Sequence, residues 1–450
     1  MTATAGPGPA ATRWYAEYAW LGGPEPAAGV LIEAQGGRFT AVRAQVPPPA
    51  GVPRLPGLTL PGLADAHSHA FHRALRGRTH AEKGSFWTWR ERMYAVADRL
   101  NPDSYLALAR AVYAELALAG ASCVGEFHYL HHDPRGRPYA DPNVMADALA
   151  QAAADAGIRI TLLDTCYLAA GVDGAPLAGT QRRFGDADVA AWASRAGAWE
   201  PAGGHARPGA AVHSVRAVPA AALPEVAGWA ARRHAPLHVH LSEQPAENDA
   251  CLARHGRTPA ALLADAGVLG PRTTAVHATH LTGADVALLG DSGTGVCLCP
   301  TTERDLADGI GPAGSLAAAG VPLSLGSDSH AVIDLFEEAR AVEAHERLRT
   351  GRRGHFPPAD LVAMATSAGH AALGWPDAGV IAPGARADLV TVRSDSPRTA
   401  GVDPAGLPLA ATAADVTDVV VGGRPVVRAG RHLHIDVAAE LTAAIRAVTR

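Results

Sequence analysis

Between about residue 58 and about residue 374, two kinds of hydrophobic pattern alternate along the chain. Short apolar runs that end in polar residues are followed by longer stretches rich in Ala and Leu, in which apolar residues recur with the period of a helix. The first pattern predicts strands and the second predicts helices. The expected strands are 58–69, 122–128, 158–166, 209–216, 236–243, 273–277, 295–301 and 321–328. The expected helices between them include 102–119, 144–156, 189–198, 220–233 and 258–266.

Eight strand–helix units in about 310 residues predict an α/β protein built on a (β/α)8 TIM barrel with insertions. The chain before the barrel has short apolar runs broken by Gly and Pro, and the chain after it returns to short strands. We therefore expect a small flanking β-sandwich domain built from both termini. The predicted divisions are 1–58 and 377–450 for the small β domain and 59–376 for the catalytic barrel.

The composition agrees with a large barrel and argues against nucleic-acid and membrane partners. Hydrophobic residues make up 48% of the 450 residues, and the formal net charge is -5 with His neutral. The chain has no basic stripe and no apolar run long enough to span a bilayer, so we expect neither a nucleic acid nor a membrane as partner. Residues 1–12 lack the pattern of an export signal, and the five Cys have no Cys-x-x-Cys spacing. These features predict a cytoplasmic protein with reduced thiols and a small-molecule substrate, and a homodimer is one open alternative for its assembly.

Polar residues collect at the ends of the predicted strands, where barrel enzymes keep their active sites. His67 and His69 end the first barrel strand, and residues two apart on a strand face the same side. His240 ends the fifth strand and Asp328 the eighth, whereas His238 faces the same way as His240 but lies deeper. Three imidazoles and one carboxylate, with a position left for water, predict a catalytic metal site. Zn²⁺ is the default ion for these ligands, and Fe, Mn or Co also fit them.

Two further residues near the same strand ends predict proton chemistry. His277 ends the sixth strand, so we expect it to face the metal, while His280 falls in the following loop and is expected to be structural. Glu243 lies just beyond the fifth strand, where it can lean over the metal as a proton shuttle. Cys297 and Cys299, two apart on a predicted strand, are expected to be small core side chains.

Several motifs resemble those of the amidohydrolase superfamily and, within it, of the formimino-L-glutamate deiminase family. Residues 60–69 (LPGLADAHSH) look like the opening barrel strand of the superfamily, and residues 383–390 (PGARADLV) look like its return to the small β domain. The specific segments are FWTWR at 86–90 and EFHY at 126–129, and HSVR at 213–216 also resembles the deiminase family. Carried over by motif, the residues that would bind substrate are Arg90, Tyr129, His213 and Arg216, together with His72 where the family usually has Gln.

The resemblance also implies how many metal ions the site holds. Superfamily members with two metals generally use a carboxylated Lys or a carboxylate on the fourth strand, and that strand has neither here. The only Lys, Lys83, lies in the loop after the first strand. We therefore expect one divalent ion, with Zn²⁺ as the default, held by His67, His69, His240 and Asp328.

The resemblance implies a hydrolytic deiminase that converts N-formimino-L-glutamate and water to N-formyl-L-glutamate and ammonia, a reaction of histidine degradation. In the expected mechanism, Asp328 accepts a proton from the attacking water, His277 aligns the attacking oxygen, and Glu243 relays a proton to the leaving nitrogen. The two Arg suit the carboxylates of this substrate. The alternatives are another aminohydrolase of the same fold acting on a purine, pterin, triazine or pyrimidine, and a non-catalytic barrel scaffold, which would be expected to have lost ligands.

Overall fold

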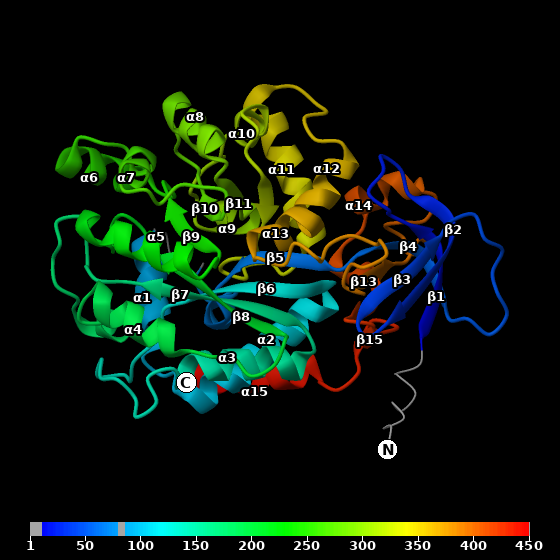
Figure 1. Cartoon of the computed structure of the whole chain (residues 1–450), viewed down its shortest axis with the longest axis horizontal. Coiled ribbons are helices and arrows are strands. Elements are labelled where there is room, and N and C mark those ends of the chain that lie inside the picture. The colour runs from blue at the N-terminus through cyan, green and yellow to red at the C-terminus, as the bar shows by residue number, and fades with distance from the viewer. Residues whose placement is uncertain (1–10, 80–85, 450) are drawn as a thin grey trace, which may run out of the picture.

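The computed structural model describes residues 11–79 and 86–449, and Figure 1 shows a barrel with a smaller sheet beside it. Lys83, expected from the sequence in the loop after the first barrel strand, lies outside the described residues. Within the described residues, eight parallel strands follow one another around the barrel in chain order, and an isolated bridge between Ser68 and Asp328 joins the first strand to the end of the last. These strands are β5 (Leu63–Ser68), β6 (Ala121–His128), β7 (Arg159–Cys166), β8 (Ala206–Val212), β9 (Leu237–Leu241), β10 (Thr273–His277), β11 (Gly295–Leu298) and β12 (Leu323–Leu325).

The predicted (β/α)8 barrel is confirmed, with one difference at its first strand. The run 58–69 is expected as one strand, but it contains the end of β4 (Arg54–Pro61), which pairs with the smaller sheet, and all of β5. The break falls at Gly62, whose amide donates a hydrogen bond to the carbonyl oxygen of Asp388 at 3.0 Å. A Cβ at this position would lie 2.5 Å from Ser122 Oγ, so the close approach of barrel and sheet requires glycine here.

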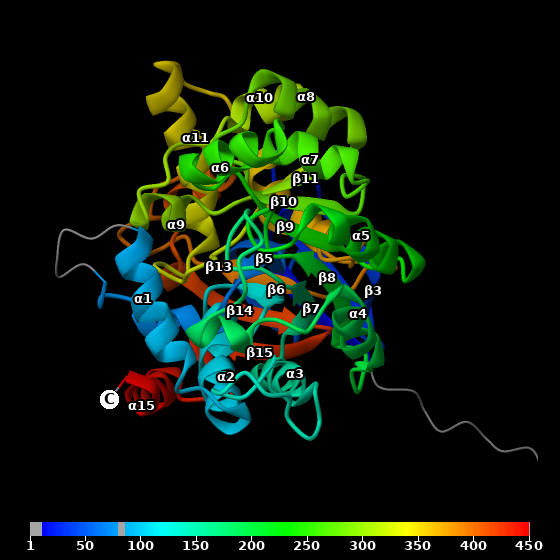
Figure 2. The ribbon, with the colours of Figure 1, turned by 90° about the vertical axis from the view of Figure 1, so that its left-hand side faces the viewer.

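Helices surround the barrel strands, as Figure 2 shows from the left-hand side of Figure 1. The predicted helices correspond to α2 (Pro102–Leu118), α3 (Val144–Ala156), α4 (Val189–Ala198), α5 (Leu223–Arg232) and α7 (Pro259–Asp265). Other described helices are α1 (Phe86–Ala97), α6 (Pro245–His255), α8 (Gly283–Ser292), α9 (Pro300–Asp305), α10 (Ala313–Ala318), α11 (Leu335–Thr350), α12 (Pro358–Ala363), α13 (Gly369–Ala372) and α14 (Leu407–Ala410). Helix α2 begins where it does because the side chains of Asn101 and Ser104 each accept a hydrogen bond from the other's amide at 2.9 Å.

The smaller sheet is built from both ends of the chain, as predicted. Its order within the described residues is β16-β15-β14-β13-β4-β1-β2-β3, and β1 and β4 form its parallel pair. In Figure 1 the blue N-terminal strands lie beside the orange and red C-terminal ones. In addition to β4, the strands are β1 (Thr12–Ala19), β2 (Ala27–Gln35), β3 (Arg38–Arg43), β13 (Leu389–Val392), β14 (Val416–Val421), β15 (Arg424–Arg428) and β16 (Arg431–His432).

Two contacts join the smaller sheet and the last segment of the chain to the barrel. Arg159 at the start of β7 donates a 3.0 Å hydrogen bond from Nη1 to Oδ1 of Asp388, and both side chains are buried. The final helix α15 (Val437–Thr449), which was not predicted, packs along α2, where Arg110 pairs with Glu440. The chain therefore returns to the outer layer of the barrel after completing the small sheet.

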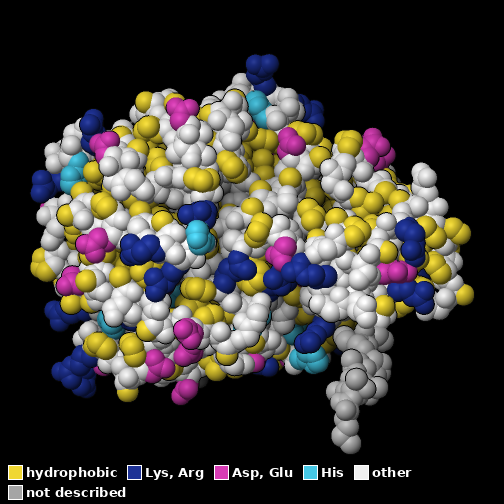
Figure 3. All heavy atoms as spheres, viewed as in Figure 1, with side chains coloured by type: hydrophobic (Ala, Val, Ile, Leu, Met, Phe, Trp, Pro, Cys, Tyr) yellow, Lys and Arg dark blue, Asp and Glu magenta, His cyan; other side chains and the backbone are white. Residues whose placement is uncertain are grey.

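The described helices do not combine the length and the apolar content that crossing a bilayer requires. On the face drawn in Figure 3, acidic and basic side chains both occur, with apolar side chains scattered between them.

Candidate active site

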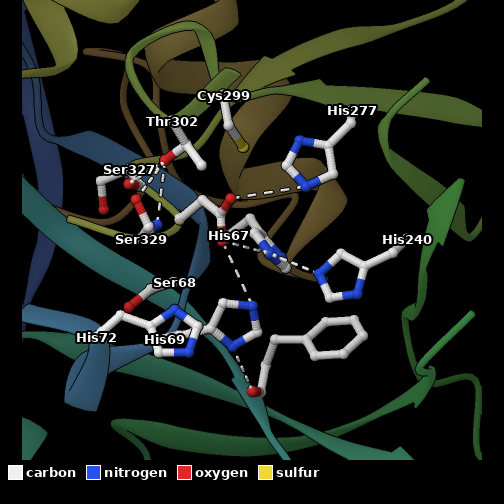
Figure 4. A network of polar contacts seen from close by, with 12 residues as sticks. His67, Ser68, His69, His72, His240, His277, Cys299, Thr302, Ser327 and Ser329 are labelled. Carbon is white, nitrogen blue, oxygen red and sulfur yellow. Dashed lines mark hydrogen bonds and ion pairs between the residues drawn. The ribbon is translucent and has the colours of Figure 1, made fainter. Parts of the chain in front are cut away.

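The four predicted metal ligands meet at the carboxyl ends of barrel strands β5, β9 and β12. His67 lies within β5 and His69 directly after it, His240 lies within β9, and Asp328 follows β12. Figure 4 shows the three imidazoles turned toward one region. Asp328 Oδ1 lies 3.4 Å from the Nε2 atoms of both His67 and His69, and the Nε2 atoms of His67 and His240 lie 3.1 Å apart.

Backbone carbonyls orient two of these imidazoles. His69 donates from Nδ1 to the carbonyl oxygen of Phe127 at 3.0 Å, and His240 donates from Nδ1 to the carbonyl oxygen of His213 at 3.0 Å. Because the hydrogen sits on Nδ1, the lone pair of each ring is on Nε2 and faces the centre of the site. This is the arrangement in which a metal-ligating imidazole donates its other nitrogen to a neighbour.

The protonation states of the four side chains suit a cation. Burial lowers the pKa of His67 and His240, and it lowers the pKa of His69 to about 3, so these imidazoles are neutral near pH 7. Burial acts to raise the pKa of Asp328, but the interactions of its carboxylate with His67, His277 and His69 outweigh burial and lower that pKa. Neutral imidazoles and an ionised carboxylate are the forms that coordinate a metal.

The distances also fit a divalent ion. Around a tetrahedral Zn²⁺ with bonds of about 2.0–2.1 Å to nitrogen and oxygen, neighbouring ligand atoms are about 3.3 Å apart. The separations of 3.4 Å from Asp328 Oδ1 to two imidazoles, and of 3.1 Å between two Nε2 atoms, lie close to that value. Three pairs of these ligand atoms therefore have the separations expected of neighbours around one ion, so this ligand set fits a metal ion.

The Asp328 carboxylate is held by a strained and closely supported turn. Asp328 has a φ of +44°, in the left-handed region that a residue with a Cβ rarely adopts. Ser327 donates to Asp65 twice, from its amide to Oδ1 at 2.8 Å and from its hydroxyl to Oδ2 at 2.5 Å. The amide of Asp328 donates to the carbonyl oxygen of His67 at 2.9 Å. These bonds connect the end of β12 to β5 and keep the carboxylate beside the imidazoles.

His277 lies among three carboxylates at the edge of the ligand set. Its Nε2 is 3.6 Å from Asp328 Oδ2 and 3.9 Å from Glu243 Oε1, and its Nδ1 is 3.5 Å from Glu303 Oε1. Burial lowers the pKa of His277, but Glu243, Glu303 and Asp328 together outweigh burial and raise it well above the ordinary value. Burial raises the pKa of Glu243. An imidazole and a carboxyl group with shifted pKa values, side by side, can exchange protons with a bound substrate.

A pocket opens in front of these groups and is lined by five aromatic residues, five histidines and several charged side chains. The five residues expected to bind substrate all line it, as do Glu243, His277 and Asp328. The other lining residues are His69, Trp89, Met93, Tyr94, Tyr167, Phe184, His240, Leu306 and Ser329. All the predicted site residues line this pocket except His67, which is fully buried and contacts Asp328 and His240.

Two of the expected substrate residues form a pair on one side of the pocket. His72 Nε2 and Tyr129 Oη lie 2.9 Å apart, within hydrogen-bond distance. The His72 ring also contacts Trp89, with 5.0 Å between ring centroids. Burial lowers the pKa of His72 well below its ordinary value, so the ring is neutral near pH 7. A neutral His at this position acts as a hydrogen-bonding group, as the amide of Gln does.

Of the other three expected substrate residues, His213 and Arg216 come from the segment after β8, and Arg90 comes from α1. His213 packs on Tyr167 with 4.4 Å between ring centroids. Arg216 donates from Nε to Glu247 Oε2 at 2.8 Å, and its Nη2 lies 3.7 Å from Glu243 Oε2. The guanidinium of Arg90, on α1, lies 5.5 Å from the centroid of the Tyr94 ring. The pocket thus has two arginines in its wall.

Sequence reasoning missed two buried carboxylates that support the site. Glu247 accepts from the amide of Ser242 at 2.8 Å as well as from Arg216, so it holds the turn just before Glu243. Glu303 faces His277 and accepts from the amide of Cys299 at 2.9 Å. The spacing of Glu247, one helical turn after Glu243, was a usable indication, whereas Glu303 meets His277 only because β10 and β11 are neighbours.

Comparison with known proteins agrees with this geometry. A model described as Amidohydrolase family matches residues 58–426. The chain belongs to the amidohydrolase family. Among curated members, the chain is similar to a formimidoylglutamate deiminase of Pseudomonas aeruginosa, with 40% identity over 87% of this chain and 90% of that protein. It is also similar to an 8-oxoguanine deaminase of the same organism, with 32% identity over 85% of each chain.

Solved structures of the amidohydrolase family agree over nearly the whole length. An amidohydrolase from Brucella melitensis has a TM-score of 0.89 and 32% identity, and covers 98% of this chain and 100% of its own. An adenosine deaminase from Xanthomonas campestris with bound zinc has a TM-score of 0.82 and 25% identity, and covers 97% of each chain. The family is metal-dependent, and these relatives identify the chain as a deaminase-type hydrolase that acts on C–N bonds.

Proposed function

We propose that this amidohydrolase hydrolyses N-formimino-L-glutamate to N-formyl-L-glutamate and ammonia. The observation that carries the proposal is the pocket wall, where Arg90 and Arg216 share one cavity with the metal-type ligand set and the proton-carrying pair Glu243 and His277. A small dicarboxylate with a formimino head needs cationic groups at one end and hydrolytic groups at the other. The similarity to a formimidoylglutamate deiminase supports the same substrate.

His67, His69, His240 and Asp328 would hold one divalent ion, for which Zn²⁺ is the default with three imidazoles and a carboxylate. Such an ion supplies Lewis acidity, which lowers the pKa of a bound water toward neutrality. The relative with bound zinc supports this choice of ion. The five Cys are buried and unpaired, which suits the reducing cytoplasm in which we place the reaction.

Three side chains of the chain move or position protons in the proposed reaction. Asp328 Oδ2, which is turned away from His67 and His69, accepts the proton of the attacking water. His277, 3.6 Å from that oxygen, hydrogen-bonds the attacking oxygen and aligns it with the formimino carbon. Glu243, 3.9 Å from His277, carries a proton to the leaving nitrogen, so that ammonia departs.

The remaining pocket residues bind and orient the substrate. Arg216 and Arg90 attract its two carboxylates, while Tyr129, His72 and His213 offer hydrogen-bonding groups beside them. The guanidinium of Arg216 is positioned by buried Glu247, which limits the conformational freedom lost when substrate binds. The aromatic lining excludes water from the reacting end of the pocket.

The second candidate function is deamination of a flat heterocycle such as a purine. The specific observation in its favour is the aromatic lining, because Trp89, Tyr94, Tyr129, Tyr167 and Phe184 could stack on such a ring. The similarity to an 8-oxoguanine deaminase points the same way. Two arginines in the pocket wall count against it, since an uncharged ring does not pair with a guanidinium.

A screen for ammonia release distinguishes the two candidates. The zinc-loaded enzyme is assayed with N-formimino-L-glutamate, with analogues in which either carboxylate is converted to an amide, and with 8-oxoguanine, guanine and cytosine. We expect turnover of the dicarboxylate, a large drop in kcat/KM for the amides, and no release from the rings. Preferred turnover of a ring, or equal turnover of acid and amide, would overturn the proposal.

A further inference from the structure

The carboxylate of Asp328 faces two different groups of side chains. Its Oδ1 is near His67 and His69, while its Oδ2 lies 3.6 Å from His277 Nε2. On this second side, His277, Cys299 and Asp328 each present a ligand atom within 4.8 Å of the other two. In Figure 4 the side chain of Cys299 is directed into the same region as His277. The catalytic carboxylate thus has a second set of metal-type neighbours, one of them a thiol.

Local structure fixes the position of Cys299. As expected from the sequence, Cys297 and Cys299 both belong to a buried apolar cluster. Cys299, however, follows strand β11 and caps the start of α9, and its amide donates to Glu303 Oε1 at 2.9 Å. Because Cys299 lies after the strand, its side chain does not follow the alternation of β11. Its sulfur lies at the edge of the active site, behind His277 and Asp328, which line the pocket.

The same corner has an excess of negative charge. Glu243, Glu303 and Asp328 lie 3.9, 3.5 and 3.6 Å from His277, and Arg216 is the cation beside Glu243, at 3.7 Å. Nδ1 of the buried His277 ring faces Glu303, whereas its Nε2 faces Asp328 Oδ2. This ring nitrogen, a thiol and nearby carboxylates form a set of donors that a cation would stabilise.

We propose that His277, Cys299 and Asp328 form a second cation site, which takes a thiophilic divalent ion such as Zn²⁺ or Cd²⁺ in addition to the catalytic metal. The thiol of Cys299 and the imidazolium of His277 each release a proton to solvent when the ion binds. Cysteine sulfur is a soft ligand, so the site discriminates against Mg²⁺ and Ca²⁺. It is the weaker site, because the two ions share Asp328 and repel each other.

Occupation of this second site inhibits the enzyme. This consequence rests on the proposed function, in which Asp328 Oδ2 accepts the water's proton and His277 aligns the attacking oxygen. An ion bound to both groups removes the proton acceptor and the aligning group together. Binding of the ion does not depend on the substrate, so the site and the reaction can be tested separately.

The experiment titrates Cd²⁺ into holoenzyme that holds one Zn²⁺ per chain. Thiolate-to-cadmium charge-transfer absorption in the short-wavelength ultraviolet, measured as a difference spectrum, reports sulfur coordination, and elemental analysis reports both metals. Wild type, Cys299→Ala and the matched control Cys297→Ala are compared, with Mg²⁺ as a non-thiophilic ion. Cys299→Ser is a second variant of similar volume, and it provides the same comparison if the Ala variant does not fold.

We expect wild type and Cys297→Ala to bind one Cd²⁺, gain the absorption band and keep their Zn²⁺. The Cys299 variants should lack the band and bind Cd²⁺ at least about 10–100-fold more weakly, because even the loss of a residue that only supports a ligand has this effect. The loss of enzyme activity should increase with the absorption band at each Cd²⁺ concentration. Mg²⁺ should produce neither the band nor the inhibition. A band that persists without Cys299, no band in wild type, or Cd²⁺ uptake matched by Zn²⁺ loss would overturn the inference. A band without N-formimino-L-glutamate hydrolysis would instead refute only the proposed function.

Discussion

Replacement of Arg216 by Met tests the assignment of substrate most directly. In the proposed complex, Arg216 donates charge-assisted hydrogen bonds to a substrate carboxylate, each worth about 1.5–3 kcal/mol. Loss of one such bond lowers kcat/KM about 10–150-fold. Most of the change should be in KM, because a carboxylate remote from the reacting carbon binds in the ground state and the transition state alike. Steady-state ammonia release provides both constants.

The structure shows that the same substitution has a second effect. Arg216 donates to Glu247 at 2.8 Å, and the Glu247 side chain is fully buried. Removing one partner of a buried pair costs about 3–5 kcal/mol of unfolding free energy. We expect the lower end of that range, because Arg216 is 22% exposed and Glu247 keeps its hydrogen bond from Ser242. Urea unfolding of the two proteins measures this loss.

The double variant Arg216→Met, Glu247→Gln separates the two effects. Gln accepts the Ser242 amide as Glu247 does, and it leaves no unpaired charge behind. We expect this variant to recover most of the stability but none of the kcat/KM, and to treat the dicarboxylate and its amide analogue alike. If kcat/KM returns together with stability, Arg216 is a structural residue and the reasoning about the substrate carboxylate is refuted.

Three further predictions follow from the site and the fold. Elemental analysis should find close to one tightly held divalent ion per chain, and its removal by a chelator should abolish activity; two tightly held ions would contradict the ligand assignment. Glu243→Gln and His277→Asn should keep that ion but lose about 10²–10⁴-fold in kcat, and near wild-type rates would disprove the proton roles. Asp388→Asn, which breaks the buried pair with Arg159, should lower the unfolding free energy at pH 7 by about 3–5 kcal/mol. Burial acts to raise the pKa of Asp388, but Arg159 and other neighbours outweigh burial and lower that pKa. The contribution of Asp388 to the unfolding free energy is therefore present above the unfolded pKa of about 3.9 and is lost as pH falls through the folded pKa. Urea unfolding of the variant should accordingly depend less on acid than that of wild type.

The predictions that succeeded from sequence rest on local periodicity. Apolar runs and helical stretches identified all eight barrel strands, because each strand and helix carries its own pattern of buried positions. Because side chains alternate along a strand, the spacing of His67 and His69 predicted that both face the barrel interior. The positions of Asp328 and His240 at strand ends predicted that they lie at the same end of the barrel. The break at Gly62 was missed because the apolar pattern continues across it, and only the approach of Asp388 and Ser122 requires the glycine.

By itself, the sequence determined the order of the strands and helices, the barrel, and which chemical groups lie at the strand ends. Each of these features can be inferred from the pattern of apolar and polar residues within a few positions along the chain. The closure of the barrel decided the detailed contacts of the active site, because it brings together side chains that lie far apart in the sequence and that no local pattern connects. It places Ser327 on Asp65 across 262 residues, which fixes the strained turn that aims Asp328. It also sets Glu303 and Cys299 beside His277, where the sequence showed only a helix start and a core cysteine. Contacts of this kind depend on the shear and packing of distant strands, so only the tertiary structure can show them.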